Sequence, residues 1–447
     1  MGIIASLQHT FPGGVHPNEG KELSMSEPIR PVEPGEILRF PMSQHIGAPA
    51  EPVVQVGDHV KKGQLIGKAS GFVSANIYSS VSGDVVEIAP HAVVGGGVVP
   101  CVVINRDHQD EAVDHFGEEV DVSRLSKEEI LERIKNSGIV GMGGAGFPTH
   151  VKLMPKNPEQ IDHVIVNGAE CEPYLTSDYR LMMERSEDLI EGLRIVLSLF
   201  PGAKGVLAIE KNKPEAIARL EYLTQNMPNI QVLPLKTKYP QGAERQIIYV
   251  TTGRRIYSRK LPAEAGCIVD NVQTILAIYD GVARNIPSIS RVMTITGNGV
   301  KNPGNVFVPY GMSHKEVMEQ MGGFVEEGVQ KMISGGPMMG IALYDLDVPV
   351  TKTSSSILAT MEDEVSAALT TNCIRCGRCV KACPSHLVPQ MMADAAERRD
   401  LEMFQRLNGM ECYECGSCTY VCPAKRKLTQ SFKQARRAVQ EEMRKKA

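Results

Sequence analysis

The stretch NCIRCGRCVKACP (residues 372–384) carries a cysteine pattern that recurs as ECYECGSCTYVCP (residues 411–423). Both read C-x-x-C-x-x-C-x-x-x-C-P, and together they hold eight of the 11 cysteines of the chain. A structural zinc site usually closes four ligands on one ion, with two C-x-x-C pairs separated by a longer loop. Three closely spaced cysteines and a fourth before proline are instead typical of two 4Fe-4S clusters, in which the fourth cysteine of each run binds the other cluster.

The spacing therefore predicts a helical two-cluster ferredoxin module over residues 362–430, with two zinc knuckles as the alternative. Gly377 and Gly416 stand where the loops must turn tightly so that backbone N–H groups can point at sulfide. Such a module alone would only conduct single electrons. The predicted ligands are Cys373, Cys376, Cys379 and Cys422 for one cluster, and Cys412, Cys415, Cys418 and Cys383 for the other.

The rest of the composition limits the possible functions. At 447 residues the chain exceeds what one hydrophobic core usually supports, so about two to four domains are expected. A formal net charge of −4 gives no reason to expect a nucleic-acid partner. Cys101, Cys171 and Cys267 are scattered, which argues against a disulfide framework and for a reducing compartment. No apolar run reaches the roughly 18 residues that span a bilayer.

The N-terminal third predicts a small all-β unit. Short β-branched runs separated by glycines follow one another from VVQVGDHVKKGQLIG (residues 53–67) onward. The pattern resembles the barrel-sandwich of lipoyl and biotinyl carriers, which present a modifiable lysine at a central hairpin. This chain has SGFVSANIYSS (residues 70–80) there, so a swinging arm is not expected and the unit is interpreted as structural.

Strands alternate with helices from about residue 127 onward, which predicts an α/β domain. The signals include a helix with a capping box from Ser126 to Glu129, a helix at 186–199 and another after Pro214. A hairpin is expected around residues 302–304, and TKTSSSILATMEDE (residues 351–364) is interpreted as a linker. The predicted units are an N-terminal arm at 1–35, a barrel-sandwich hybrid at 36–110, an α/β domain at 127–290, a smaller α+β unit at 291–350, the cluster module at 362–430 and a basic C-terminal helix at 431–447.

A glycine-rich segment marks a candidate phosphate site. Gly141, Gly143 and Gly146 satisfy G-x-G-x-x-G, in which backbone N–H groups can approach a phosphate. The motif alone is weak, and Pro148 with no smooth helix start argues against a standard dinucleotide turn.

Four blocks in one order strengthen this segment: GMGGAGFPTHVK (141–152), VNGAECEP (166–173), YPQGAERQ (239–246) and VDNVQT (269–274). The series resembles the flavin- and NADH-binding subunit of respiratory complex I, over roughly residues 128–345. The resemblance implies a Rossmann-like FMN-binding domain with NADH stacked beside the flavin, followed by a soluble-ligand-binding β-grasp unit. The cofactor-binding residues that it implies are Gly141, Gly143, Gly144, Gly146, Lys152, Asn167, Glu170, Tyr239, Gly242, Glu244, Asn271 and Thr274 for FMN, and Phe147 and Glu172 for NADH.

This sequence departs from the pattern of that family at three positions. Ala169 and Ala243 replace acidic residues, and Pro155 stands where the family has a second stacking aromatic. These changes bear on the NADH pose more than on the FMN site. No catalytic acid or base is expected, because flavin chemistry itself converts hydride transfer into single-electron transfer.

The order of all modules is similar to that of the C subunit of the Rnf family, membrane-bound ferredoxin:NAD oxidoreductases that couple electron flow to Na⁺ or H⁺ translocation. The resemblance implies a peripheral electron-input subunit on the cytoplasmic face of the cell membrane, containing two 4Fe-4S clusters and FMN and using NAD(H). Its implied partners are the other Rnf subunits, including membrane-embedded ones and an iron-sulfur subunit, and ferredoxin, with membrane contact through partners. Two alternatives remain: a stand-alone flavo-iron-sulfur reductase of the cobalamin reductase type, and a relay or assembly subunit with a decayed flavin site.

Overall fold

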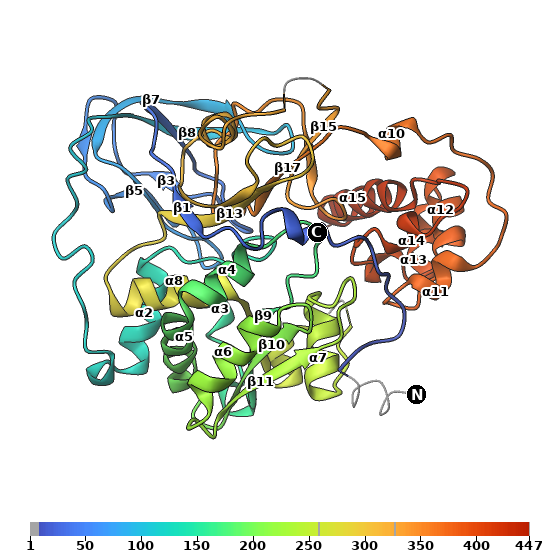
Figure 1. Cartoon of the computed structure of the whole chain (residues 1–447), viewed down its shortest axis with the longest axis horizontal. Helices are drawn as coiled ribbons and strands as arrows, with labels where there is room; N and C mark the ends of the chain where they lie inside the picture. The colour runs from blue at the N-terminus through green and yellow to red at the C-terminus, as the bar shows by residue number, and fades with distance from the viewer. Residues whose placement is uncertain (1–8, 258–259, 326–327, 447) are drawn as a thin grey trace.

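A computed structural model describes residues 9–257, 260–325 and 328–446. Two β-rich units, an α/β unit and a helical unit form one molecule, with the helical unit at its side (Figure 1). The predicted arm at 1–35 is described from residue 9, and its first eight residues lie outside the described part. Among the described residues, no helix is long and apolar enough to cross a membrane.

The barrel-sandwich unit consists of two antiparallel sheets. One has the order β2 (Ile37–Pro41), β8 (Val98–Arg106), β7 (Gly83–Ala92), β4 (His59–Val60), and the other β3 (Glu51–Pro52), β5 (Leu65–Lys68), β6 (Ile77–Tyr78). Inward residues such as Leu38, Phe40 and Ile66 are fully buried between the sheets. The segment between β5 and β6, residues 69–76, is the hairpin that lacks the carrier lysine.

The α/β unit has a fully parallel four-stranded sheet. Its order is β11 (Ile230–Leu235), β10 (Lys204–Glu210), β9 (His163–Gly168), β12 (Cys267–Asn271). Because the chain moves from β9 to β10 on one side and returns to β12 on the other, the topological switch lies between β9 and β12. In such sheets, ligands bind beyond the carboxyl ends of the strands at the switch.

Helices cover both faces of this sheet because the strands are apolar on both sides. The expected capping box is present at the start of α2 (Lys127–Asn136), and helices occur at 186–199 and after Pro214 as expected. One face packs against α2, α4 (Ser177–Glu184), α5 (Ser186–Leu199), α6 (Pro214–Thr224) and α8 (Val272–Ala283), and the other against α7 (Glu244–Thr252).

The third unit has a six-stranded mixed sheet that extends beyond residues 291–350. Its order is β1 (Ile29–Pro31), β14 (Gly304–Pro309), β13 (Ser290–Thr296), β17 (Ser356–Thr360), β15 (Lys331–Ser334), β16 (Ile341–Leu343). The expected hairpin is confirmed as the antiparallel pair β13 and β14.

The linker interpretation of residues 351–364 was wrong, because Ser356–Thr360 is a central strand whose Ile357, Leu358 and Ala359 are fully buried. Its flanking serines and threonines made a short apolar strand look like a polar connection.

A buried histidine in this unit predicts acid sensitivity. His314 begins α9 (His314–Gln320), is fully buried, and its Nδ1 lies 2.8 Å from the Val348 carbonyl oxygen. Burial lowers the pKa of His314 to about 4, whereas an exposed histidine titrates near 6.5. Between these values the unfolded chain binds a proton that the folded chain does not. The free energy of unfolding therefore decreases as the pH is lowered, by up to about 1.4 kcal/mol per pH unit.

The matched variant is His314→Asn, whose side-chain N–H can still reach the Val348 carbonyl. Thermal unfolding is followed by circular dichroism at pH 7.5 and 5.5. The melting temperature of the variant should decrease less between these two pH values than that of the native chain. Equal decreases would contradict the assignment of this acid sensitivity to His314.

The helical unit contains α11 (Arg378–Ala382), α12 (Pro389–Glu397), α13 (Leu401–Arg406), α14 (Ser417–Tyr420) and α15 (Leu428–Lys446). Helix α15 covers residues 431–446 of the predicted basic helix, whose last residue lies outside the described part, and begins within the predicted module. Its apolar face, with Leu428, Phe432, Ala435 and Val439, is buried in the core of the unit. The basic residues occupy the rest of an amphipathic helix that closes the module.

Candidate functional site

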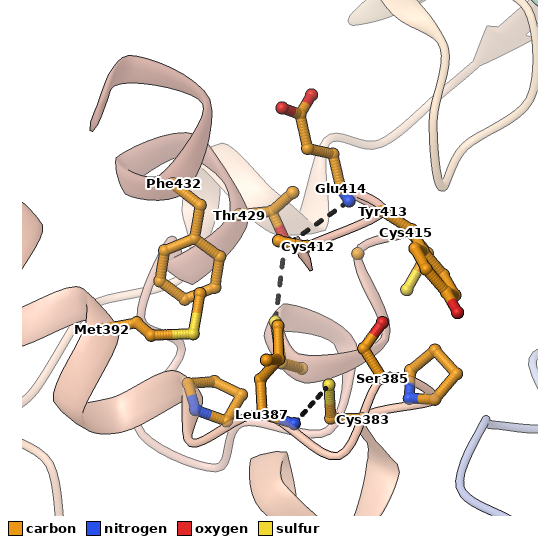
Figure 2. Close-up of a pocket in the computed structure, with 14 residues that line it drawn as sticks. Cys383, Ser385, Leu387, Met392, Cys412, Tyr413, Glu414, Cys415, Thr429 and Phe432 are labelled. Atoms are coloured by element: carbon orange, nitrogen blue, oxygen red, sulfur yellow. Dashed lines mark hydrogen bonds between the residues drawn. The ribbon is translucent and has the colours of Figure 1, made fainter. Parts of the chain in front are cut away.

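The second cysteine set surrounds a cavity in the helical unit. Its lining includes Cys383, Cys412, Cys415 and Cys418, the four residues predicted to share one cluster. Figure 2 shows Cys383, Cys412 and Cys415 around this space, with Met392 and Phe432 forming an apolar wall on one side. The empty volume is about 350 Å³, its open mouth included. Cys383 thus joins the cysteines of the other run, as crossed ligation requires.

Backbone N–H groups point at the sulfurs of this set. The N–H of Glu414 donates to Cys412 Sγ over 3.3 Å, and that of Leu387 donates to Cys383 Sγ over 3.4 Å. Positive φ angles at Gly416 and Glu414 turn the loop to permit this. Hydrogen bonds of this kind tune the potential of a thiolate-bound cluster.

Burial raises the pKa of the Cys412 and Cys418 thiols to about 12. Without a metal these thiols therefore keep their protons at neutral pH, and iron would have to displace them. Four convergent thiols around one apolar cavity fit a 4Fe-4S cluster in donor type and number. Within residues 9–257, 260–325 and 328–446, no group of three or more His, Cys, Asp or Glu side chains could hold a single metal ion.

The first cysteine set lies at the surface. Cys373 and Cys376 are exposed, whereas Cys379 and Cys422 are half-buried. The pKa of Cys379 is raised, chiefly by burial and in part by the nearby Cys422, which places these residues of different runs together. The N–H of Arg375 donates to Cys373 Sγ over 3.4 Å, repeating the geometry at Glu414 and Cys412.

The glycine segment lies at the carboxyl edge of the parallel sheet, by the switch between β9 and β12. The Met142 N–H donates to Thr274 Oγ1 over 2.9 Å, and a Cβ added at Gly143 would lie 2.7 Å from Asn271 Cβ. The tip at Gly143 and Gly144 is exposed, and a Cβ added at Gly144 would meet no atom within 4 Å. Asn167, at the end of β9, pairs in register with Asn271. The glycine turn therefore packs closely on one side against the end of β12, which is paired with the end of β9, and its tip is open to solvent on the other.

Lys152 supplies a positive charge beside this turn. Its ammonium donates to the Val269 carbonyl over 2.7 Å and to Asp270 Oδ1 over 3.0 Å. Burial opposes the charge, but Asp270 and Glu244 raise the pKa of Lys152 above its usual value. Burial also raises the pKa of Asp270, whose Oδ2 has no partner in the described structure. The phosphate-bearing end of FMN fits this site, because an open glycine turn and Lys152 lie together at the carboxyl edge of the parallel sheet.

Asn167, Gly242 and Glu244 complete this group of predicted residues. Asn167 Nδ2 donates to the Gly242 carbonyl over 2.8 Å, which fixes the third sequence block against the end of β9. Glu244 begins α7, and burial raises the pKa of its carboxyl group despite the charge of Lys152.

Other predicted residues have partners within the protein. Glu170 Oε1 accepts from the Asp178 N–H over 2.7 Å, at the first turn of α4. Glu172 Oε1 accepts from the N–H groups of Met338 and Met339 over 2.6 and 3.0 Å. Gly146 lies at positive φ where the loop returns, and the half-buried Phe147 accepts through its carbonyl from the Gly141 N–H.

Tyr239 connects the α/β unit to the second cysteine set. Its side chain is almost fully buried, and its hydroxyl donates to the Cys415 carbonyl over 2.7 Å. Nearby, Gln246 Nε2 donates to Tyr413 Oη over 2.9 Å, and Arg245 forms an ion pair with Glu411. The contacts of Arg245 and Gln246 were not predicted from the sequence, because nothing in the local sequence indicates contacts with residues about 170 positions away.

Four family models match successive parts of the chain. They are the RnfC barrel sandwich hybrid domain at residues 9–109, the Nuo51 FMN-binding domain at 134–280, the SLBB domain at 292–342 and the 4Fe-4S dicluster domain at 367–423. The chain thus has four domains of these kinds, in the order expected.

Curated relatives align over nearly the whole chain. The C subunit of the proton-translocating ferredoxin:NAD⁺ oxidoreductase complex of Clostridium ljungdahlii is 47% identical, covering 94% of this chain and 92% of the relative. The C subunit of the Na⁺-translocating complex of Acetobacterium woodii is 41% identical, covering 96% and 97%. The NAD⁺-reducing NiFe-hydrogenase in its H2-reduced state aligns over 71% of this chain and 61% of that one, with a TM-score of 0.49 and 17% identity, a likeness too weak to argue from. On the two relatives, the chain belongs to the family of C subunits of Rnf-type ion-translocating ferredoxin:NAD⁺ oxidoreductase complexes.

Proposed function

We propose that this chain is the subunit through which a ferredoxin:NAD⁺ oxidoreductase complex exchanges electrons with NAD(H). One observation carries the proposal: the Tyr239 hydroxyl, in the third flavin-family block, touches the backbone of Cys415. The third flavin-family block and the four-cysteine cavity are therefore in direct contact, as a two-electron carrier and a one-electron carrier in series require.

The residues that we propose for FMN form two groups. Gly141, Gly143, Gly144 and Gly146 shape the turn that receives the phosphate, and Asn271 and Thr274 hold it from behind. Lys152, Asn167, Gly242 and Glu244 line the adjoining end of the sheet. FMN, when bound, supplies the conversion between hydride transfer and single-electron transfer. The Lys152 charge would favour a more negative bound flavin.

For three residues the proposal differs from the family pattern. Glu170 caps α4, and Glu172 holds the loop at Met338, so both act by positioning neighbouring segments. Tyr239 stabilises the junction with Cys415. Phe147 remains the residue proposed to contact the nicotinamide nucleotide.

The two cysteine sets have different positions in the proposed path. Hydrogen bonds from the α/β unit to the helical unit reach Pro384, Glu411, Tyr413 and Cys415, next to the second set. The first set, at Cys373, is instead exposed beside Ile374, which is 67% exposed. We propose that the second set lies on the flavin side and the first set faces the electron-transfer partner.

The remaining parts of the proposal come from the family. They are a peripheral place on the cytoplasmic face of the membrane, docking to other Rnf subunits and ferredoxin, and coupling by the complex to Na⁺ or H⁺ translocation. The unit boundaries predicted from the sequence, apart from those of the third unit and of the C-terminal helix, also belong to the proposal, as do the finer assignments of a Rossmann-like and a β-grasp fold.

The test uses the full chain, purified anaerobically and reconstituted with iron, sulfide and FMN. Addition of NADH should bleach the flavin absorbance and then produce electron paramagnetic resonance signals of reduced clusters. Clusters that dithionite reduces but NADH does not, in a chain that retains no FMN, would overturn the proposal and leave a relay subunit.

A further inference from the structure

Two buried cations lie behind the glycine turn. Arg291, in β13, and Lys352, in the connection before β17, are 3% and 0% exposed. The Lys352 ammonium donates to the Gly138 and Asn76 carbonyls, each over 2.6 Å. One Arg291 Nη donates to the Lys352 carbonyl and the other to the Met142 carbonyl, the latter over 3.3 Å. The two cations thus hold both ends of the segment 138–142 that enters the turn.

Neither cation has a carboxylate within ion-pair distance in the described parts of the chain, but the charge of the buried Asp178 opposes the lowering of the Arg291 pKa by burial. Among the other buried lysines, Lys213 lies 3.9 Å from Glu210. Lys21 resembles Lys352 in donating only to backbone carbonyls, but the charge of Glu170 acts on it. Burial lowers the pKa of Lys352 to about 7, with no charged neighbour that offsets the effect. A buried charge without a counter-charge is costly, so Lys352 is charged only in part at neutral pH, and a bound anion would favour its charged form.

The barrel-sandwich hairpin completes this arrangement. Asn76, which accepts from Lys352, belongs to the hairpin that bears the modifiable lysine in carrier domains. A Cβ added at Gly138 would lie 2.4 Å from the Asn76 carbonyl oxygen, so hairpin and loop are in direct contact. At the far end of the turn, the Ile46 N–H donates to the Gly146 carbonyl over 3.2 Å, and a Cβ at Gly146 would lie 2.9 Å from Thr353. The turn is thus held at both ends by the barrel-sandwich unit and the connection 351–354.

We infer that the hairpin, Lys352 and Arg291 form a clamp that fixes the glycine turn and places positive charge behind it, where that charge would attract the phosphate of FMN. Lys352 and Arg291 are positioning residues, because their contacts are with the backbone behind the turn while its exposed tip faces the ligand. In this arrangement the hairpin, which carries a modifiable lysine in carrier domains, instead accepts a hydrogen bond from Lys352 through the Asn76 carbonyl. This inference rests on the proposed FMN site.

The test is a comparison of FMN with riboflavin, which lacks the phosphate, in the flavin-depleted full chain. Lys352→Met keeps the length and apolar stem of the side chain and removes its charge. We expect the dissociation constant for FMN, measured by flavin fluorescence, to rise at least tenfold, while that for riboflavin changes less than twofold. Iron content and circular dichroism report whether the variant is folded.

Different outcomes separate this inference from the proposed function. A native chain that binds neither flavin would overturn the FMN site itself. Equal weakening of FMN and riboflavin in Lys352→Met would make Lys352 a packing residue and overturn the clamp, as would unchanged FMN binding. If Lys352→Met does not fold, Arg291→Met is measured in the same way, and its FMN-to-riboflavin preference should also fall at least tenfold.

Discussion

Replacing Cys383 with alanine is expected to remove the iron held with Cys412, although Cys383 belongs to the other sequence run. The four residues of this set line one cavity, and Cys383 is buried there with Cys415 and Cys418. Because a 4Fe-4S cluster needs its four thiolates, loss of one should lower the iron content of the reconstituted chain from about eight to about four. Cys267→Ala, at a buried cysteine outside both runs, should leave the iron unchanged.

Double variants distinguish crossed from uncrossed ligation. Cys383→Ala combined with Cys412→Ala should lose no more iron than either single variant, because both residues serve one cluster. Cys383→Ala combined with Cys373→Ala should lose nearly all iron, because the two serve different clusters. The reverse pattern, with full loss from the first pair, would show that each run binds its own cluster.

This assignment was available from the sequence because cluster motifs are local. Spacing and the proline after each fourth cysteine imply the fold of the loops, and positive φ angles at Gly377 and Gly416 agree with the tight turns expected there. Helices with strong start signals, such as α2 after Ser126, were predictable for the same reason. Each of these features depends on a few neighbouring residues.

Contacts between distant segments were not available from the sequence. Tyr239 was assigned to the flavin by its family block, yet its hydroxyl reaches Cys415, 176 positions away. Lys352 lay in a stretch interpreted as a linker, because six polar residues precede the short apolar run of β17. Its burial depends on units that begin near residues 37 and 127, whose packing no local pattern encodes.

Gly144→Val is expected to abolish high-affinity FMN binding without harming the fold. Gly144 lies at the exposed tip of the turn, has no positive φ, and offers open space to an added Cβ. A valine there strains neither backbone nor packing, but it occupies the side of the turn from which N–H groups would approach a phosphate. We expect the dissociation constant for FMN to rise at least tenfold, about 1.4 kcal/mol, with iron content unchanged.

The matched control is Gly202→Val, in an exposed turn before β10 where an added Cβ also meets no atom within 4 Å. Gly143→Ala is a poorer test, because its Cβ would collide with Asn271 and weaken both fold and site. Native-like FMN affinity in Gly144→Val would show that the phosphate does not rest on this turn.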